Sequence, residues 1–359
     1  MCPAGRKVVA SSICEGVPKP SNKTSAGDLL RMQYDTQNGE PLSVVTAAGP
    51  FTTNANLEFN PLVDLLAIVR AKKPDVVILT GPFVDVNHPS VKNGMVQLET
   101  ENGDRVTVPF GNIFSEKFVP ELERCYEEVP DLKTQFVLVP SLDDAFHENV
   151  FPQPPFADQQ EGGGKPVNLP GAEGLVNGSL GLQYVEDAGR AGAAKRSSLD
   201  GDQKRVHCVS NPATFKINDV VFGVTSIDPI MALNAQDCSV GISRMTRMAQ
   251  HLIMQQSYMP LFPVTAGSGR NVDLRHMDKY SMEVTPDVLL VPSKLAPFAK
   301  DVCDTMVVNP NTLAKGSTGG SFAHITIHPH KREDLEKVGR DDMVESNIKD
   351  RARVQVIKI

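Results

Sequence analysis

Short apolar runs that do not alternate with polar residues place the strongest limit on how this chain can fold. Residues 42–48 read LSVVTAA, and residues 74–85 read PDVVILTGPFVD. A strand with one face in water alternates polar and apolar residues, so an unbroken apolar run indicates a strand buried on both faces, as in a parallel sheet. These runs end at Gly49-Pro50 and Gly81-Pro82. The sequence therefore predicts buried parallel strands that end in sharp turns.

Helical segments separate these strands. Asn60-Pro61 begins a segment with apolar residues at helical spacing, since Asn is a good N-cap and Pro suits the first helical turn. A second helix is predicted over residues 115–129, and a third strand over 135–139. Strand, helix, strand, helix and strand in succession predict βαβ units in a mainly parallel sheet, and hence an α/β fold.

The remainder of the chain is predicted to extend this pattern. A helix is expected over residues 243–256, where Met and Leu residues recur on one face. Alternation near the C-terminus indicates antiparallel strands with one solvated face. The expected strands are 206–210, 220–225, 287–291, 322–327 and 353–359.

Three segments do not fit the α/β pattern. Residues 157–204 are rich in glycine and poor in aromatic residues, so we expect a disordered insertion. Residues 19–40 are polar and are predicted to be a linker. Lys7 to Ile13 reads as one strand, which cannot be stable without a sheet to join.

Composition excludes several classes of protein. The chain has 36 Lys and Arg residues against 43 Asp and Glu, a net charge of −7, which argues against unaided binding to nucleic acid. No apolar run approaches the roughly 20 residues that a membrane helix needs, so no membrane partner is expected. The six cysteines include no CxxC pair, which is typical of buried thiols in a reducing compartment.

Strand ends in an α/β sheet are where metal-dependent phosphoesterases place their ligands. That chemistry uses Asp, His and Asn side chains on successive strand ends to hold two metal ions. The corresponding positions here are Gly49, Pro50, Gly81, Pro82, Ser141, Leu142, Asp143, Ser293 and Lys294. Proline cannot ligate a metal, and Asp143 is the acid that remains, with Asp85 and Asp144 nearby. The sequence predicts no catalytic, metal or cofactor site.

Other motifs leave weaker alternatives. FAHITIHPH contains His324, His328 and His330, which favour a solvated strand end over a metal site because they fall well beyond the expected strand end. KGSTGGS at residues 315–321 has phosphate-friendly residues but lacks the spacing of a P-loop. A pairing of Ser141 with His147 is conceivable, but no oxyanion motif accompanies it.

Several blocks of the chain together resemble the B-subunit family of DNA polymerase alpha–primase. They include GRKVVASSICEGVPKP, KPDVVILTGPFVDVNHPSV, LVPSLDDAFHENVFPQPPF, HLIMQQSYMPLFP and VVNPNTLAKGSTGGSFAHI, in family order over nearly the whole chain. The resemblance implies a calcineurin-like phosphoesterase sandwich of two mixed β-sheets flanked by helices, with its metal ligands lost. Residues 1–18 would be the last strand of a truncated OB-like domain, 19–40 a linker, and 41–359 the inactive phosphoesterase-like domain.

The resemblance also implies a role without catalysis. The expected partner is the C-terminal, zinc-binding region of the polymerase alpha catalytic subunit, with primase subunits in the same nuclear complex and DNA contacted indirectly. The chain would act in initiation of replication and in lagging-strand priming, either as a fragment or as a truncated gene product. The alternatives are the small subunit of polymerase delta or epsilon, and an active metal-dependent phosphoesterase.

Two apolar clusters are candidate partner contacts, because exposed aromatic and Met residues often anchor interfaces. Packing in the domain's own core is an equally good interpretation of both. The candidates are Tyr258, Met259, Leu261, Phe262, Phe151 and Phe156.

Overall fold

The fold is known from a computed structural model of the chain. The structure describes residues 16–94, 96–99, 105–156, 180–193, 204–237, 243–262 and 271–359. The strand predicted over Lys7 to Ile13 lies outside these residues, as does most of 157–204. No helix in the described ranges is both long and apolar enough to cross a membrane.

The larger sheet has six strands in the order β17-β15-β2-β3-β6-β7. Strands β2, β3, β6 and β7 are parallel to one another, whereas β15 runs antiparallel to both β2 and β17. The strands are β2 (Leu42–Ala48), β3 (Val76–Thr80), β6 (Gln135–Val139), β7 (Val206–Cys208), β15 (Ser321–Ile327) and β17 (Ala352–Lys358). The predicted strands in this part of the chain are confirmed to within about two residues at each end.

A second sheet has five strands in the order β11-β12-β10-β9-β8. Its central strands β12, β10 and β9 are parallel, and the two edge strands pair antiparallel with their neighbours. The strands are β8 (Ala213–Ile217), β9 (Val220–Val224), β10 (Val288–Leu290), β11 (Phe298–Val302) and β12 (Thr305–Asn309).

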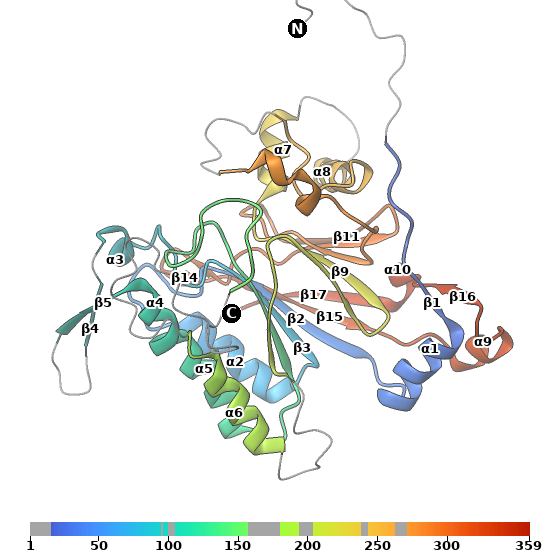
Figure 1. The fold of residues 1–359 in the computed structure, drawn as a ribbon, viewed down its shortest axis with the longest axis horizontal. Helices are drawn as coiled ribbons and strands as arrows, with labels where there is room; N and C mark the ends of the chain where they lie inside the picture. Colours follow the sequence, from blue (N-terminus) through green and yellow to red (C-terminus); the bar gives the residue numbers. More distant parts are fainter. Residues whose placement is uncertain are drawn as a thin grey trace, which may run out of the picture.

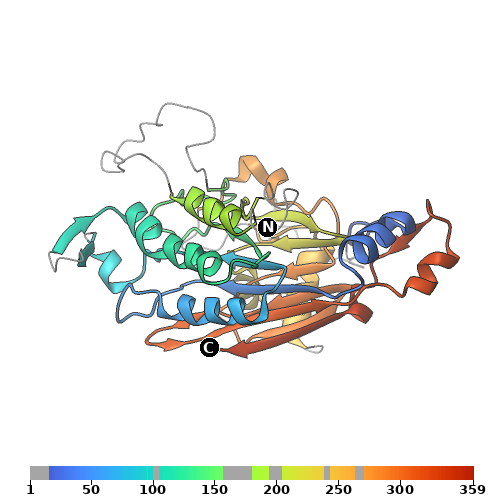
Figure 2. The ribbon, with the colours of Figure 1, turned by 90° about the horizontal axis from the view of Figure 1, so that it is seen from below.

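The two sheets pack face to face between two layers of helices (Figures 1 and 2). Alternate residues of each central strand face different cores. In β2, Val44 belongs to the core between the sheets and Val45 to the core under the helices α2 (Asn60–Lys72), α5 (Val119–Glu128) and α6 (Leu182–Ala193). Helices α7 (Pro229–Gln236) and α8 (Arg244–Met254) cover the outer face of the five-stranded sheet in the same way. Burial on both faces explains why the strands show no alternation, and the predicted sandwich of two mixed sheets is confirmed.

The principal helices begin and end close to the predicted positions. Asn60 is the first residue of α2, and Pro61 occupies the first turn. The helix predicted over 115–129 corresponds to a π-helical stretch at Phe114–Phe118 followed by α5 (Val119–Glu128), and the short helix α4 (Phe110–Ile113) precedes them without having been predicted. The helices are α2 (Asn60–Lys72), α3 (Pro89–Lys92), α4 (Phe110–Ile113), α5 (Val119–Glu128), α7 (Pro229–Gln236), α8 (Arg244–Met254), α9 (Arg332–Lys337) and α10 (Ile348–Arg351), with a 3₁₀ segment at Leu274–Tyr280. Short hairpins join β4 (Val96–Glu99) to β5 (Arg105–Val108) and β13 (Ala314–Lys315) to β14 (Thr318–Gly319).

The segment predicted as a linker is folded over most of its length. Strand β1 (Lys23–Ser25) pairs antiparallel with β16 (Met343–Glu345), and α1 (Ala26–Leu30) continues into a π-helical turn at Arg31–Thr36. Ser25 caps α1, because its Oγ accepts from the N–H of Asp28 at 3.2 Å. Leu29 is fully buried. The linker prediction is wrong for residues 23–36, because pairing with a distant strand orders a stretch whose own composition is polar.

Part of the predicted disordered insertion is also helical. Helix α6 (Leu182–Ala193) lies beside α5, and Val185 on it is fully buried. The carboxylate of Glu186 accepts hydrogen bonds from the backbone N–H groups of Arg205 and Val206, which fixes α6 against the start of β7. Disorder is therefore the wrong prediction for residues 182–190. Burial of Val185 and the hydrogen bonds that Glu186 accepts at the start of β7 thus order this part of the glycine-rich segment.

A buried ion pair connects the ends of the two sheets. Arg351, just before β17, donates from Nη2 to Oδ2 of Asp219 in the β8–β9 turn at 2.8 Å, and the side chains are 8% and 7% exposed. The same guanidinium donates to the carbonyl oxygens of Ser346 and His328. Burial raises the pKa of nearby Asp287, whereas the N–H of Val221 and the charge of Arg351 act in the opposite direction. Arg351 is therefore the cation that this buried acidic region depends on.

We expect Arg351→Met to lower the free energy of unfolding by about 3–5 kcal/mol, because it leaves Asp219 buried without its cation. Urea unfolding followed by circular dichroism measures the change. Arg353→Met is the matched control, since Arg353 lies two residues away and is exposed, and its effect should stay within about 0.5 kcal/mol. Equal effects of the two substitutions would contradict a role for the ion pair.

Candidate functional site

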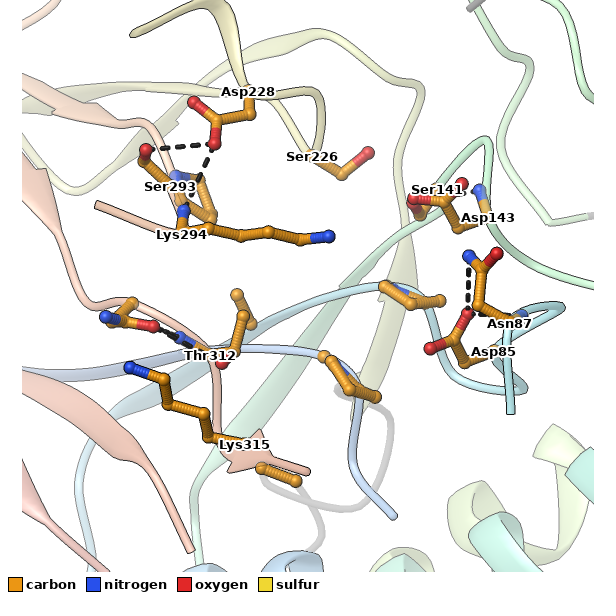
Figure 3. Close-up of a pocket in the computed structure, with 18 of the residues that line it drawn as sticks. Asp85, Asn87, Ser141, Asp143, Ser226, Asp228, Ser293, Lys294, Thr312 and Lys315 are labelled. Atoms are coloured by element: carbon orange, nitrogen blue, oxygen red, sulfur yellow. Dashed lines mark hydrogen bonds between the residues drawn. The ribbon is translucent and has the colours of Figure 1, made fainter. Parts of the chain in front are cut away.

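A pocket of about 380 Å³ lies at the carboxyl ends of the strands of both sheets (Figure 3). Its walls are the loops that follow β2, β3, β6, β9, β10 and β12, at residues 48–50, 81–87, 141–143, 226–228, 292–294 and 311–316. In an open α/β sheet this edge is where ligands bind, because loops from several parallel strands converge there. The pocket is therefore where chemistry would be expected if the chain had any.

Close approach of two loops forms the floor of this pocket. A Cβ atom on Gly49 would lie 2.1 Å from the carbonyl oxygen of Pro82, and one on Gly81 would lie 2.5 Å from Oδ2 of Asp144. Real Cβ atoms do not come this near to other atoms, so neither position can carry a side chain without moving the backbone. Both positions are consequently closed to any ligating residue.

Asp144 holds the loops after β3 and β6 together. Its Oδ1 accepts from the N–H groups of Phe83 and Val84, and its Oδ2 accepts from the N–H of Ser141 at 2.7 Å. The side chain is buried, and burial raises its pKa to about 7 although the three N–H donors act against this. Asp144 therefore stabilises the backbone and does not line the pocket.

Asp228 plays the corresponding part on the five-stranded sheet. Its Oδ1 accepts from the N–H of Met231 and caps α7, while its Oδ2 accepts from the hydroxyl of Ser293 at 2.9 Å and the N–H of Lys294 at 3.1 Å. These bonds orient the loop after β10. The side chain of Lys294 then extends across the pocket toward Ser141 and Asp143 (Figure 3).

Two acids remain on the opposite wall. Asp85 accepts from both the backbone N–H and the side-chain amide of Asn87, at 2.8 and 3.1 Å. Burial raises the pKa of Asp85, the bonds from Asn87 lower it, and the nearby charges of Asp143 and Lys294 have opposite smaller effects. Within the described residues, no group of three or more His, Cys, Asp or Glu side chains is placed to hold a metal ion. Two lysines and three prolines line the pocket beside three acids, and one of these acids, Asp228, already accepts hydrogen bonds from Ser293 and Lys294, so this is a poor cation site.

The structure brings eight of the nine predicted strand-end positions together in this pocket. They are Gly49, Pro50, Gly81, Pro82, Ser141, Asp143, Ser293 and Lys294. The ninth, Leu142, is buried in the core under α7 and α8. Six further polar residues line the pocket without having been predicted as strand-end positions, namely Asn87, Ser226, Asp228, Asn311, Thr312 and Lys315. Asp228 could have been predicted from the sequence, because it follows the strand predicted at 220–225, and residues that follow parallel strands line this edge of a sheet.

The histidines of FAHITIHPH do not form a site. Nε2 of His324 lies 2.9 Å from Oγ of Ser43, and Nδ1 of His330 lies 3.2 Å from Nε2 of Gln33. His147 contacts the carbonyl oxygen of Pro154, so its ring is not paired with Ser141. The rings of His324, His330 and His147 thus each have a separate structural partner.

Four of the six partner-contact candidates are buried in the chain's own cores. Tyr258, Met259 and Phe151 belong to the core under α7 and α8, and Phe156 belongs to the core under α2 and α5. In the folded domain these side chains pack internally, so they are not available to a partner. Leu261 is half-buried, and Phe262 is 76% exposed. Phe262 is the candidate that remains accessible.

Comparison with known proteins gives a consistent set of relatives. A family model that describes the B subunit of DNA polymerase alpha/epsilon matches residues 44–300. The B subunit of DNA polymerase alpha from Mus musculus is 33% identical over 327 residues, covering 90% of this chain and 44% of that protein. The protein of the same name in Schizosaccharomyces pombe is 27% identical over 336 residues, covering 91% and 49%. The chain thus spans less than half the length of these relatives.

A solved structure described as a novel archaeal phosphodiesterase covers 88% of this chain and 99% of its own, with 11% identity and a TM-score of 0.34. A likeness this weak carries no argument about the site. The family match is stronger evidence than this structural likeness, because the matched residues include five of the six loops around the pocket and strands from both sheets. The chain belongs to the B-subunit family of DNA polymerases alpha and epsilon.

Proposed function

We propose that the chain is a non-catalytic accessory subunit of DNA polymerase alpha–primase. In this role it docks the C-terminal region of the catalytic subunit, in a nuclear complex that also contains the primase subunits, during initiation of replication and lagging-strand priming. Family membership and the relatives named as B subunits of DNA polymerase alpha support the accessory role. Contacts with DNA are made through the partners, in keeping with the net charge of −7.

The observation that carries the proposal is the set of residues at the strand ends. Pro50 and Pro82 have no ligating atoms in their side chains, and Gly49 and Gly81 have no room for a side chain. Two-metal hydrolysis needs several carboxylate, imidazole or amide ligands converging within a few ångström. The pocket lies at the edge of the sheets where such a site would be expected, but its residues do not suit that chemistry. The role that remains for the domain is to bind partner proteins through its surface.

Asp85 and Asp143 favour a second candidate, a phosphoesterase with an unusual ligand set. Both acids line the pocket, and the negative charge of Asp143 contributes to raising the pKa of Asp85. The ammonium group of Lys294 points to the same region and lowers the affinity of such a pair for a divalent cation. A small subunit of polymerase delta or epsilon is the alternative within the same class of function.

We expect the purified chain to bind neither Mn²⁺ nor Zn²⁺ stoichiometrically in isothermal titration calorimetry, and to leave bis(4-nitrophenyl) phosphate intact. The reason is that two acids facing a lysine do not complete a two-metal site. Asp85→Asn and Asp143→Asn are the matched variants, and neither should change the background rate. Hydrolysis that disappears in either variant would establish the phosphoesterase and refute the proposal.

The exposed Phe262 offers a test of the docking role. We expect affinity purification of the tagged chain from its own cells to recover the polymerase alpha catalytic subunit and both primase subunits. Phe262→Glu should reduce that recovery roughly tenfold if the ring is an interface anchor. Tyr184→Glu on α6 is the control, since Tyr184 is another exposed aromatic residue, and it should leave recovery unchanged.

Two results of this purification would change the assignment. Recovery of delta or epsilon subunits would move the chain to a sister complex. Recovery of no polymerase subunit, with both variants folded as judged by circular dichroism, would refute the accessory role. Equal recovery with Phe262→Glu and the unsubstituted chain would place the contact elsewhere on the surface.

A further inference from the structure

Strand β17 is an open edge of the six-stranded sheet. The two sheets have four edge strands, and the seven residues of β17 make it longer than β8 and β11, with five each, and β7, with three. It runs along the rim of the sheet as the dark red strand of Figure 2. Its pairing with β15 is continuous from Ala352 to Lys358, so no bulge interrupts it.

The pairing with β15 determines which backbone groups of β17 face outward. The N–H of His328 donates to the carbonyl of Arg351 at 3.0 Å, and the N–H of Ile359 donates to the carbonyl of Gly320 at 3.1 Å. In an antiparallel ladder every second residue exchanges these bonds. The odd-numbered residues from 351 to 359 therefore bond to β15, and the N–H and C=O groups of Ala352, Val354, Val356 and Lys358 point away from the sheet.

These outward groups have no strand to pair with in the described parts of the chain. Among the described residues, β15 is the only strand that β17 pairs with through hydrogen bonds, although β11 of the other sheet lies near it. It also contains no proline, the residue that proteins commonly use to block an edge. By contrast, the edge of β8 is partly covered, because the hydroxyl of Tyr258 donates to the carbonyl of Ala213. The rim at β17 is thus a template for another strand.

The side chains of β17 indicate what kind of strand would pair with it. Arg353 and Lys358 are exposed cations, and the segment 352–359 contains no acid. Val354 packs against the core between the sheets, and Val356, two residues further along the strand, is on the same face and is 37% exposed. Opposite charges and β-branched residues placed across from one another stabilise paired strands.

We propose that β17 binds an extended segment of a partner protein by strand addition, and that the segment carries acids opposite Arg353 and Lys358 and apolar residues opposite Val354 and Val356. Backbone hydrogen bonds from the outward groups supply much of the affinity, and the alternate side chains supply specificity. This inference is separate from the proposed function, because it depends on the strand edge alone. A chain that failed to recover any polymerase subunit could still bind such a segment.

An antiparallel register fixes a probe. The peptide Glu-Thr-Val-Thr-Val-Glu-Thr places its first Glu opposite Lys358, its two Val residues opposite Val356 and Val354, and its second Glu opposite Arg353. Its first, third, fifth and seventh residues then bond to β17, while the N–H groups of the second and fourth point to solvent.

The test is binding of this peptide, labelled with fluorescein, to the full chain by fluorescence anisotropy. We expect N-methylation of both Val residues to weaken binding roughly tenfold, because two hydrogen bonds to β17 are lost. N-methylation of the second and fourth residues is the matched control with the same number of methyl groups, and it should have little effect. Arg353→Glu with Lys358→Glu should weaken binding of the acidic peptide and strengthen binding of a version with Lys in place of Glu.

A second measurement locates the peptide on the chain. With ¹⁵N-valine labelling, exchange of the amides of Val354 and Val356 should slow when the peptide binds. The amide of Gln355, which already bonds to β15, should not change in a ¹⁵N-glutamine sample. This readout does not depend on any substitution in the protein.

Three outcomes would overturn the proposal. The first is no binding, and the second is binding that both N-methylated peptides retain equally, which would show attraction of charge without strand pairing. The third concerns the protein without peptide. In that case the amides of Val354 and Val356 would already exchange slowly, and their exchange would slow further as the protein concentration rises. That result would show that a second copy of the chain, not a partner segment, occupies the edge.

Discussion

The close approach of the loops after β2 and β3 is the constraint on which the pocket depends. Gly49 lies against the backbone of Pro82, and Gly81 lies against Asp144 and Ser141. Contacts this short allow glycine alone at both positions, and Asp144 fixes the arrangement by accepting three backbone N–H groups. The loops can therefore be rigid without a metal ion to hold them. A buried carboxylate does here what coordinated side chains do in a metal site, which is to set the spacing of neighbouring strand ends.

Burial of both sheets on both faces explains why these loops meet at all. Parallel strands present their carboxyl ends at one edge, and face-to-face packing brings the loops of the second sheet to the same edge. Asp228 then orients Ser293 and Lys294 from the five-stranded sheet, just as Asp144 orients Ser141 from the other. The pocket is a result of the fold itself. It would persist after the loss of a catalytic function, because the packing that forms it is independent of the residues that line it.

The sequence was sufficient for the strands of the six-stranded sheet and for β9 and β10. It was insufficient for β8, β11 and β12, which were not predicted, and for segments ordered by distant partners. Val76–Leu79 could be identified because its apolar run has one physical explanation, burial on both faces. Residues 23–36 and 182–190 were misjudged because their order comes from β16 and from the backbone of Arg205, which local composition does not encode. Most of the pocket was predictable, since strand ends can be read from the strands. The partner contacts were not, because Phe156 and Phe262 have the same chemistry in the sequence and opposite exposure in the structure.

The distinction between a buried core and an accessible surface also limits which groups of this chain can contact another protein. Once four of the six apolar candidates are assigned to internal packing, the large apolar anchors are few, and Phe262 stands near the end of a described range. The backbone at the rim is a different resource, because its hydrogen-bonding groups do not depend on side-chain identity. An edge strand with two exposed cations and one exposed valine combines a general means of attachment with modest specificity. The rim of the sheet and the pocket at the strand ends are therefore independent of each other, because the hydrogen-bonding groups of β17 do not depend on which side chains line the pocket.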